Sequence, residues 1–297
     1  MGDYISSTLD LALQLVLSGL VLGLLYALLA SGLSLLYGAA RVINLAQGQA
    51  LMLGAYITFW LFLLFNLNPI ISIVLAGSIC ALVGASTYFI LFRPAIKRAE
   101  SMAAFEFTSL ILTFGLVLVL ENSSALLWGA APKTFSFMTE IYSFFGLYLT
   151  GNRLVTLLGS LILVVGLQLF IRKTRTGKAT TYTIEESDAA RIVGVNIDRT
   201  FLFSVMIGFA TAAVAGTFYS MFYVTSPFIG TFYTLTAWVV IILGGVGSVV
   251  GCIVGGLILG MLETVGVFFL SPAMKVAINY TVLIIILFIR PRGLFTR

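Results

Sequence analysis

Residues 11–37 read LALQLVLSGLVLGLLYALLASGLSLLY and contain no Asp, Glu, Lys or Arg. A helix crosses the hydrocarbon core of a bilayer with about 20 apolar residues, so this stretch is long enough to span it. It is longer than the core of a signal peptide, and the acidic residues Asp3 and Asp10 precede it instead of basic ones. The stretch therefore predicts a retained transmembrane helix.

The composition extends this interpretation to the whole chain. Of the 297 residues, 60% are hydrophobic and 9% are charged, against about 45–50% and about 25% in soluble domains. We therefore expect an all-α, polytopic helix bundle of about eight or nine spans that forms a single membrane domain over residues 1–297. The apolar runs are Leu11–Tyr37, Ile43–Phe65, Pro69–Phe92, Phe105–Trp128, Leu154–Ile171, Phe201–Val224, Ile229–Val249, Val250–Leu270 and Met274–Ile289.

Glycines concentrate where two apolar runs meet without a polar break. These residues are Gly244, Gly245, Gly247, Gly251 and Gly255. Glycines four residues apart, such as Gly251 and Gly255, lie on one helix face and allow close packing against a neighbour. The alternative is a hinge or broken helix that exposes backbone toward a pathway. The junction at Gly244–Gly251 therefore fits either two tilted helices or one span followed by a re-entrant segment.

Basic residues gather in three hydrophilic regions. They are Arg93, Lys97 and Arg98, the loop at 172–200, and Arg290, Arg292 and Arg297 near the C-terminus. An even number of spans separates these regions, and short basic loops stay in the cytoplasm. This predicts a cytoplasmic C-terminus and an external N-terminus. The net charge of +5 is thus explained by membrane topology instead of nucleic-acid binding.

Five polar residues within or beside the spans are candidates for a substrate pathway: Asn44, Gln47, Gln49, Glu121 and Glu263. A carboxylate inside the bilayer is costly and faces the bundle interior, where it needs a partner. Amide side chains bind polar groups without the desolvation cost of a full charge. The alternative, which we favour for Glu121 and Glu263, is that each carboxylate is a hydrogen-bonded tie between helices. The alternative for Asn44 is the cap of a helix start.

The sequence offers no enzyme site, metal site or cofactor site. It contains no histidine, and Cys80 and Cys252 lie in apolar runs without metal-ligand spacing. The pair Gly177–Lys178 is followed by Ala179 and does not complete a phosphate-binding loop. If ATP drives this protein, another subunit hydrolyses it.

The polar loop at 172–200 separates two spans. Ser187 suits the cap of a short helix, Asp188 its first turn, and Gly194 its end. Such a helix on the inner face would be a docking element for a partner. The simpler alternative is a solvated connection.

Several stretches together resemble one family. They are Gly19–Gly23 (GLVLG), Gly32–Gly38 (GLSLLYG), Arg41–Gly48 (RVINLAQG), Leu53–Tyr56 (LGAY), Gly177–Ala179 with Ala190–Asn196 and Arg199, Leu243–Ser248 (LGGVGS) with Gly251, Gly255, Gly256 and Gly260, and Arg290–Phe295 (RPRGLF). The sequence resembles the inner-membrane permease subunits of bacterial and archaeal ABC importers for branched-chain amino acids, and most of all the shorter of their two permeases.

This resemblance implies partners that the chain does not contain. They are a second homologous permease, two cytoplasmic ATPase subunits that hydrolyse ATP, and an extracytoplasmic substrate-binding protein, all working at the lipid bilayer. It assigns contact with the ATPases to Gly177, Lys178, Ala190, Arg191, Gly194, Asn196 and Arg199.

Two departures from the family pattern bear on function. Gln47 stands where members often carry His, and Thr181–Tyr182 where they carry an Arg-Ala pair. Permeases for urea and short-chain amides are close relatives, so urea or a short-chain amide is the alternative substrate. A secondary transporter that works without ATP and an intramembrane enzyme are the hypotheses from other classes.

Overall fold

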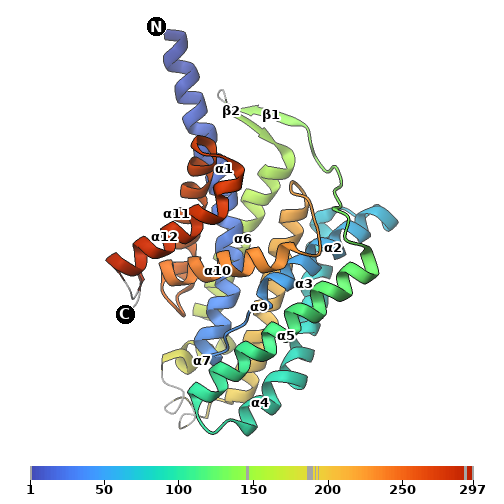
Figure 1. The fold of residues 1–297 in the computed structure, drawn as a ribbon, viewed down its shortest axis with the longest axis vertical. Coiled ribbons are helices and arrows are strands. Elements are labelled where there is room, and N and C mark those ends of the chain that lie inside the picture. The colour runs from blue at the N-terminus through green and yellow to red at the C-terminus, as the bar shows by residue number, and fades with distance from the viewer. Residues whose placement is uncertain are drawn as a thin grey trace.

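The computed structural model describes residues 2–144, 147–185, 190, 192, 194–290 and 293–295, with the side chains of 2–10, 144 and 147 left out. Figure 1 shows the chain as long helices with one small hairpin. In chain order the elements are α1 (Gly2–Ala40), α2 (Gln47–Phe65), α3 (Pro69–Thr87), η1 (Tyr88–Phe92), α4 (Arg93–Arg98), α5 (Met102–Trp128), β1 (Ile141–Phe144), β2 (Leu147–Thr150), α6 (Gly151–Lys173), α7 (Arg175–Glu185), α9 (Ile197–Ser220), α10 (Ile229–Gly244), α11 (Val249–Phe269), η2 (Pro272–Met274) and α12 (Lys275–Ile289).

The described helices confirm the predicted polytopic bundle. Eight of them are long and apolar enough to cross a membrane, and α10 is an additional shorter apolar helix of 16 residues. At 1.5 Å per residue α10 is about 24 Å long, less than the roughly 30 Å of hydrocarbon that a perpendicular span must cross. In Figure 1, α10 runs crosswise to α1 and α9.

The junction near Gly244–Gly251 consists of two helices joined by a tight turn. Helix α10 ends at Gly244, and α11 begins at Val249 after Ser248, whose hydroxyl accepts a 3.0 Å hydrogen bond from the Gly251 amide. Gly245 and Gly247 have φ angles of 103° and 79°, a region that favours glycine because it has no Cβ. The predicted span over 229–249 therefore ends earlier, at this turn.

The centre of the bundle is formed by α1, α2, α9 and α11, which pack through small residues. A Cβ at Gly54 of α2 would overlap the backbone carbonyl of Ala213 on α9. A Cβ at Gly256 of α11 would lie 2.7 Å from the Gly23 carbonyl of α1. Such close backbone approach is the means by which helices associate in lipid, where the hydrophobic effect supplies little.

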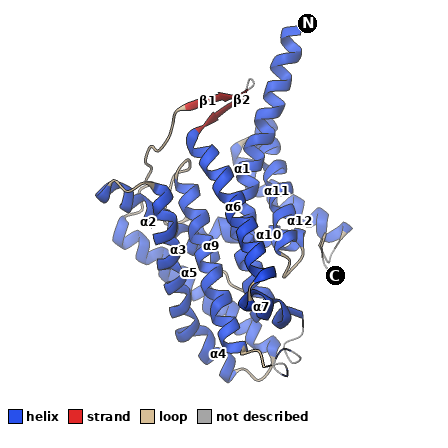
Figure 2. Ribbon diagram, turned by 180° about the vertical axis from the view of Figure 1, so that it is seen from behind, coloured by secondary structure: helices blue, strands red, loops and turns tan. Residues whose placement is uncertain are grey.

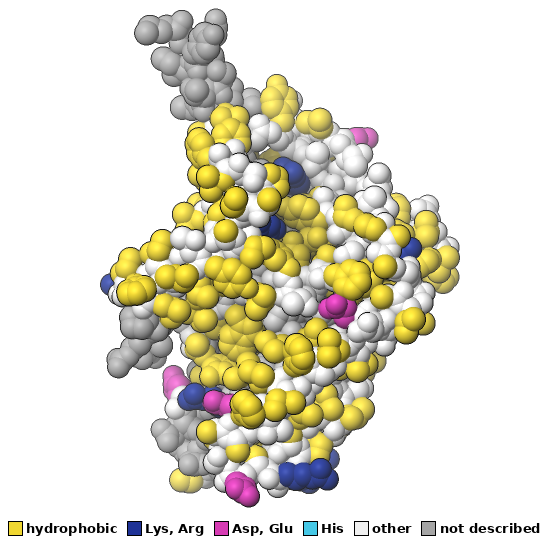
Figure 3. Space-filling view, viewed as in Figure 1, with side chains coloured by type: hydrophobic (Ala, Val, Ile, Leu, Met, Phe, Trp, Pro, Cys, Tyr) yellow, Lys and Arg dark blue, Asp and Glu magenta, His cyan; other side chains and the backbone are white. Residues whose placement is uncertain are grey.

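The remaining spans lie at the periphery. Only 22% of the most apolar window of α5 is buried, 17% of that of α6, and 11% of that of the span formed by η2 and α12. Figure 3 accordingly shows hydrophobic side chains over much of one face, with charged side chains at its lower end and a few others scattered above. These surfaces are suited to contact lipid or another apolar protein surface.

The two ends of the molecule differ. Helices α4 and α7 lie at the end opposite the N-terminus and the hairpin (Figure 1). Figure 2 shows the hairpin of β1 and β2 beside the start of α6. Its strands pair Ile141 with Thr150 and Phe144 with Leu147. This hairpin was not predicted from the sequence.

Candidate functional site

The connection from α1 to α2 returns into the bundle before the second helix begins. Helix α1 ends at Ala40, Arg41 has a φ of 54°, and α2 starts only at Gln47. The Gln47 side-chain nitrogen donates a 2.8 Å hydrogen bond to the carbonyl of Gly208, roughly halfway along α9. The predicted span over 43–65 is therefore helical only from Gln47, deep inside the bundle.

Side chains of other helices satisfy the irregular backbone of this connection. Thr113 of α5 accepts a hydrogen bond from the Leu45 amide at 3.2 Å and donates one to the Ile43 carbonyl at 2.9 Å. Thr234 of α10 accepts from the Gly48 amide at 2.8 Å and donates to the Leu45 carbonyl at 2.9 Å. Non-helical backbone at membrane depth needs such partners because lipid offers none. Helix α2 thus starts on a framework made by α5, α9 and α10.

Four of the five predicted pathway residues form two hydrogen-bonded pairs around the start of α2. Asn44 and Gln47 are fully buried, and the Asn44 amide nitrogen donates to Gln47 Oε1 at 3.2 Å. Gln49 donates to Glu121 Oε2 at 3.3 Å, and Thr231 of α10 donates to the same oxygen at 3.3 Å. The Gln49 carbonyl oxygen is buried without a hydrogen-bond partner among the described residues. We call Asn44, Gln47, Gln49 and Glu121 the amide cluster; its role in transport stays a prediction.

Glu263 lies in a separate ion pair. Its side chain is 2% exposed, and the Lys275 ammonium is 2.9 Å from Glu263 Oε1. The Tyr26 hydroxyl is 3.0 Å from each carboxylate oxygen and donates to them. Helices α1, α11 and α12 therefore meet at one buried carboxylate. Lys275, which the sequence analysis did not single out, is recognisable as a lysine at the start of an otherwise apolar run.

Four aromatic rings surround the Lys275 ammonium. Their centroids lie 5.0 Å away for Phe232, 5.5 Å for Tyr233, 5.7 Å for Tyr223 and 6.0 Å for Tyr26. All four are within the range of cation–π attraction. Phe232 and Tyr233 lie between Thr231 and Thr234 along α10. Thr231 bonds Glu121 of α5 and Thr234 bonds the start of α2, so the first turns of α10 separate the ion pair from the amide cluster.

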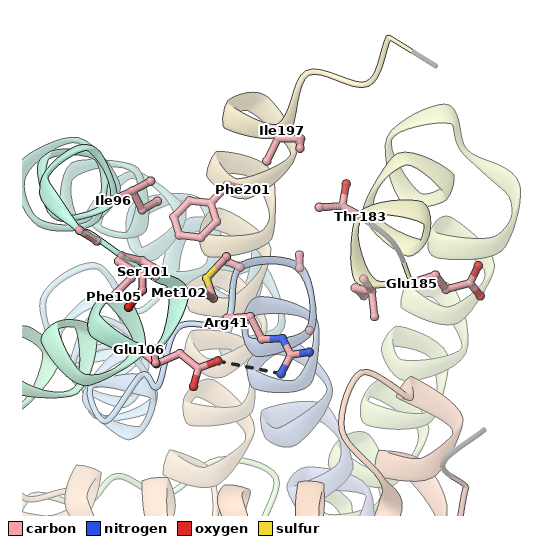
Figure 4. A pocket seen from close by; sticks show the side chains of 16 residues that line it. Arg41, Ile96, Ser101, Met102, Phe105, Glu106, Thr183, Glu185, Ile197 and Phe201 are labelled. Carbon is pink, nitrogen blue, oxygen red and sulfur yellow. Dashed lines mark ion pairs between the residues drawn. The ribbon is translucent and has the colours of Figure 1, made fainter. Parts of the chain in front are cut away.

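A cavity of about 730 Å³ opens at the end of the molecule formed by α4 and α7. It is lined by the last residues of α1, the first residues of α5 and α9, and the end of α7. Figure 4 shows Arg41 and Glu106 pointing toward each other, with their charged groups 3.9 Å apart, and Thr183 and Glu185 of α7 on the opposite side.

None of the predicted ATPase-contacting residues lines this cavity, and one of them lies outside the described part of the chain. Gly177 is buried in α7, where its backbone packs against Ile171, and Lys178 is exposed. Asn196 caps α9 by accepting a 3.0 Å hydrogen bond from the Arg199 amide. Ala190 is buried, and Gly194 has a φ of 84°. Arg191 and most of the predicted helix at 187–194 fall outside the described residues. Helix α7 itself was not predicted.

The glycine turn between α10 and α11 contacts the C-terminal segment. The amides of Leu294 and Phe295 donate to the carbonyls of Leu243 and Gly244 at 2.9 and 3.1 Å, so this segment satisfies the last carbonyls of α10. Gly244 and Gly251 pack backbone to backbone, and a Cβ at Gly255 would lie 2.9 Å from the Val240 carbonyl. A role as a hinge stays a prediction for these glycines.

Among the described residues, no group of three or more Asp, Glu or Cys side chains is arranged to hold a metal ion. The polar features described above are the amide cluster, the Glu263–Lys275 pair and the open cavity beside α7.

Comparison with known proteins identifies the family. Residues 15–287 match the family model for the branched-chain amino acid transport system / permease component. The chain is 32% identical to the high-affinity branched-chain amino acid transport system permease protein LivH of Salmonella typhimurium over 300 residues, with 96% of each chain covered. LivH of Escherichia coli K12 is 31% identical and BraD of Pseudomonas aeruginosa 28% identical, again over 96% of each chain.

One solved structure, PsaBC from Streptococcus pneumoniae in complex with Fab, superimposes with a TM-score of 0.48 at 14% identity, covering 93% of this chain and 91% of that chain. That similarity is too low to establish a common fold. The family match and the LivH relatives do not depend on it, because they extend over nearly the whole sequence. The chain belongs to the family of branched-chain amino acid transport permeases.

Proposed function

We propose that this protein is a membrane-spanning permease subunit of an ATP-binding-cassette importer and that it carries branched-chain amino acids across the inner membrane. The observation that carries the proposal is the match to branched-chain amino acid permeases along almost the entire chain. The bundle of spanning helices with buried polar clusters is compatible with that role.

The proposed complex contains a second homologous permease, two cytoplasmic ATPases and an extracytoplasmic binding protein. The chain has no phosphate-binding loop in its sequence, so ATP hydrolysis is assigned to the ATPases. Helices α5 and α12 expose apolar side chains, with Leu126 and Phe288 each 87% exposed, and such faces are suited to contact a second permease or lipid.

We place the N-terminus outside and the C-terminus in the cytoplasm. Lys97 and Arg98 end α4, and Arg172 and Lys173 end α6, so both inner connections are basic. The C-terminal segment bonds the end of α10, and the following turn packs at Gly247 against Ile184 of α7. These contacts support a cytoplasmic side that contains α4, α7, the glycine turn and the C-terminus.

Helix α7 is positioned to transmit a movement of the ATPases to the membrane helices. The Ile184 side chain packs against Gly247 in the turn between α10 and α11, and against Gly38 near the end of α1. A push on α7 would therefore reach α1 and α10, two helices that flank the start of α2. This supports coupling through the loop at 172–200.

The test of function is uptake by the reconstituted complex. Proteoliposomes that contain both permeases and both ATPases, supplied with the binding protein outside, are expected to accumulate radiolabelled leucine only when ATP is inside. Urea and acetamide are the competing cargoes. Uptake of urea but not leucine would show that the substrate is urea instead of a branched-chain amino acid. Leucine flux through this chain alone, without ATP, would identify a secondary transporter.

Coupling is tested by co-purification with the ATPases. Ile192 in the inner loop is 87% exposed, and we expect Ile192→Asp to abolish ATPase co-purification while membrane insertion stays normal. Tyr148→Asp, which changes an exposed aromatic residue of the hairpin at the other end, is the matched control. Normal ATPase yield with Ile192→Asp would contradict docking at this loop.

A further inference from the structure

The ion pair of Glu263 and Lys275 is surrounded by aromatic rings, which an ion pair that only joins helices does not need. The Lys275 ammonium contacts the carboxylate at 2.9 Å and has four aromatic rings within 6.0 Å. A buried ion pair adds little to stability, because desolvation of both charges offsets their attraction, and apolar replacements are often more stable. Ionisable groups inside a membrane bundle are therefore candidates for a functional site.

The geometry has the chemistry of a receptor for an ammonium group. We call Glu263, Tyr26, Tyr223, Phe232 and Tyr233 the ammonium cage. Its carboxylate neutralises one positive charge, and its ring faces attract a cation through their quadrupoles, as in other aromatic cages that bind ammonium ligands. In the structure the occupant is the chain's own Lys275, which is a primary ammonium group on a flexible stem.

We propose that the ammonium cage binds the α-ammonium group of the transported amino acid in place of Lys275, and that the displaced Lys275 pairs with the α-carboxylate. This rests on the proposed function and names the groups that recognise the substrate. The exchange conserves charge: the resting pair has one positive and one negative group, and a zwitterion adds one of each. The loaded site therefore contains two neutral pairs and no unpaired buried charge.

Access and side-chain recognition are provided by the borders of the cage. The Lys275 side chain is 23% exposed and Tyr223 is 38% exposed, so the cage reaches the molecular surface. Helix α12, which carries Lys275, belongs to the least buried span of the bundle, with 11% of its window buried. It is the element that can move aside with the least loss of packing.

A small cavity continues from the cage between α10 and α12. It has a volume of about 40 Å³ and is lined by Phe232, Leu235, Thr236, Val239, Val276, Asn279 and Tyr280. Asn279 is 4% exposed, and its carbonyl oxygen has no hydrogen-bond partner among the described residues. The mainly apolar walls suit an aliphatic side chain, and displacement of α12 would enlarge the space to accept one.

The experiment compares charge variants of the complete reconstituted importer. Glu263→Gln and Lys275→Met each leave one charge unpaired, whereas the double variant removes both charges and keeps side-chain size. The readouts are detergent elution profile, ATPase activity stimulated by the leucine-loaded binding protein, and leucine taken up per ATP hydrolysed. Lys133→Met is the matched control, because Lys133 lies over the rings of Phe59 and Trp60 at 5.8 and 5.5 Å but has no ion pair among the described residues.

We expect the double variant to assemble and hydrolyse ATP but to take up leucine at least about tenfold less per ATP, because both charged partners of the zwitterion are missing. Lys133→Met should match wild type. A double variant with wild-type uptake per ATP would overturn the cage and leave the proposed function intact, since the pair would then be only a structural tie. A wild-type complex that imports no branched-chain amino acid would overturn the proposed function itself.

A variant at the exposed ring guards against failure of the double variant to fold. Tyr223→Leu removes one wall of the cage without touching either buried charge. Loss of one cation–π contact predicts a two- to fivefold increase in the leucine-loaded binding-protein concentration at half-maximal uptake, with about the same amount of assembled complex. An unchanged half-maximal concentration in that variant would overturn the proposal.

Discussion

Helices α9 and α5 are both apolar enough to span a membrane, yet they occupy opposite environments. Their mean hydropathies are 1.9 and 2.1, but 67% of the α9 window is buried and only 22% of the α5 window. Helix α9 carries Gly208 and Gly216 on its packed face, whereas α5 exposes Phe107 and Phe114. Hydropathy therefore predicts which helices span the bilayer, whereas small residues on one face predict which of these helices pack at the centre of the bundle.

The strongest test of this difference is a change of glycine in each environment. Gly54→Leu on α2 would force a side chain into the carbonyl of Ala213 on α9, so we expect a loss of about 3 kcal/mol or more. The expected result is aggregated protein in a detergent elution profile. Gly115→Leu on α5, where nothing lies within 4 Å, is the control and should elute like wild type. A monodisperse Gly54→Leu variant would show that this helix contact is adaptable.

A smaller loss is expected when a buried hydrogen bond is removed beside α9. Gln47→Leu removes the hydrogen bond to the Gly208 carbonyl and leaves the buried Asn44 amide nitrogen without its acceptor, and an unpaired buried polar group costs about 1–3 kcal/mol. The measurement is the thermal unfolding midpoint in detergent. Asn122→Leu on α5 is the matched control, because its side chain is exposed and bonds only its own helix. Equal midpoints for the two variants would argue against a structural role for Gln47.

The Arg41–Glu106 pair at the inner cavity should contribute less. The charged atoms are 3.9 Å apart, and the side chains are 59% and 27% exposed, so water and salt screen the interaction. We expect Arg41→Met to lower stability by at most about 1 kcal/mol and the difference to shrink as salt is added. A salt-independent loss above that limit would mean that Arg41 makes a stronger contact than this ion pair.

The smallest effect is expected on the lipid-facing side of α12. Phe288 is 87% exposed, so Phe288→Ala removes no packing from the chain and should change its stability by less than about 0.5 kcal/mol. The unfolding midpoint of the purified chain measures this. A large shift in the chain alone would mean that the exposed surface of α12 is covered by its own protein.

The runs of apolar residues in the sequence predicted the spanning helices well, but they predicted the start of α2 poorly. The run at 43–65 begins with Asn44, Gln47 and Gln49 among apolar residues, and this local pattern does not show that the helix starts only at Gln47. Helix formation is displaced there because Thr113 and Thr234, from distant parts of the chain, supply the hydrogen bonds that a helix would otherwise make internally. The hairpin at 141–150 was missed because its strands are short and do not alternate clearly between apolar and polar residues. Helix α7 was missed because it is polar overall and its larger apolar side chains are only Tyr182 and Ile184.

The residues that contact the buried carboxylates could also not be predicted from the sequence. Glu121 and Glu263 were recognisable as carboxylates that need partners. Gln49 and Thr231 bond the first, while Tyr26 and Lys275 contact the second. Tyr26 and Glu263 are 237 positions apart in the chain, and no spacing rule joins residues at that separation.

The amino-acid sequence by itself determined that the chain lies in a membrane as a helix bundle, since the cost of placing backbone and side chains in hydrocarbon depends on local composition and length. Its family resemblance also supplied the class of transporter. Only the tertiary structure decided where α2 begins, that α10 and α11 are separate helices, and which aromatic rings enclose Lys275. Those features depend on contacts between helices, and such contacts are set by how the side-chain surfaces of distant segments fit together.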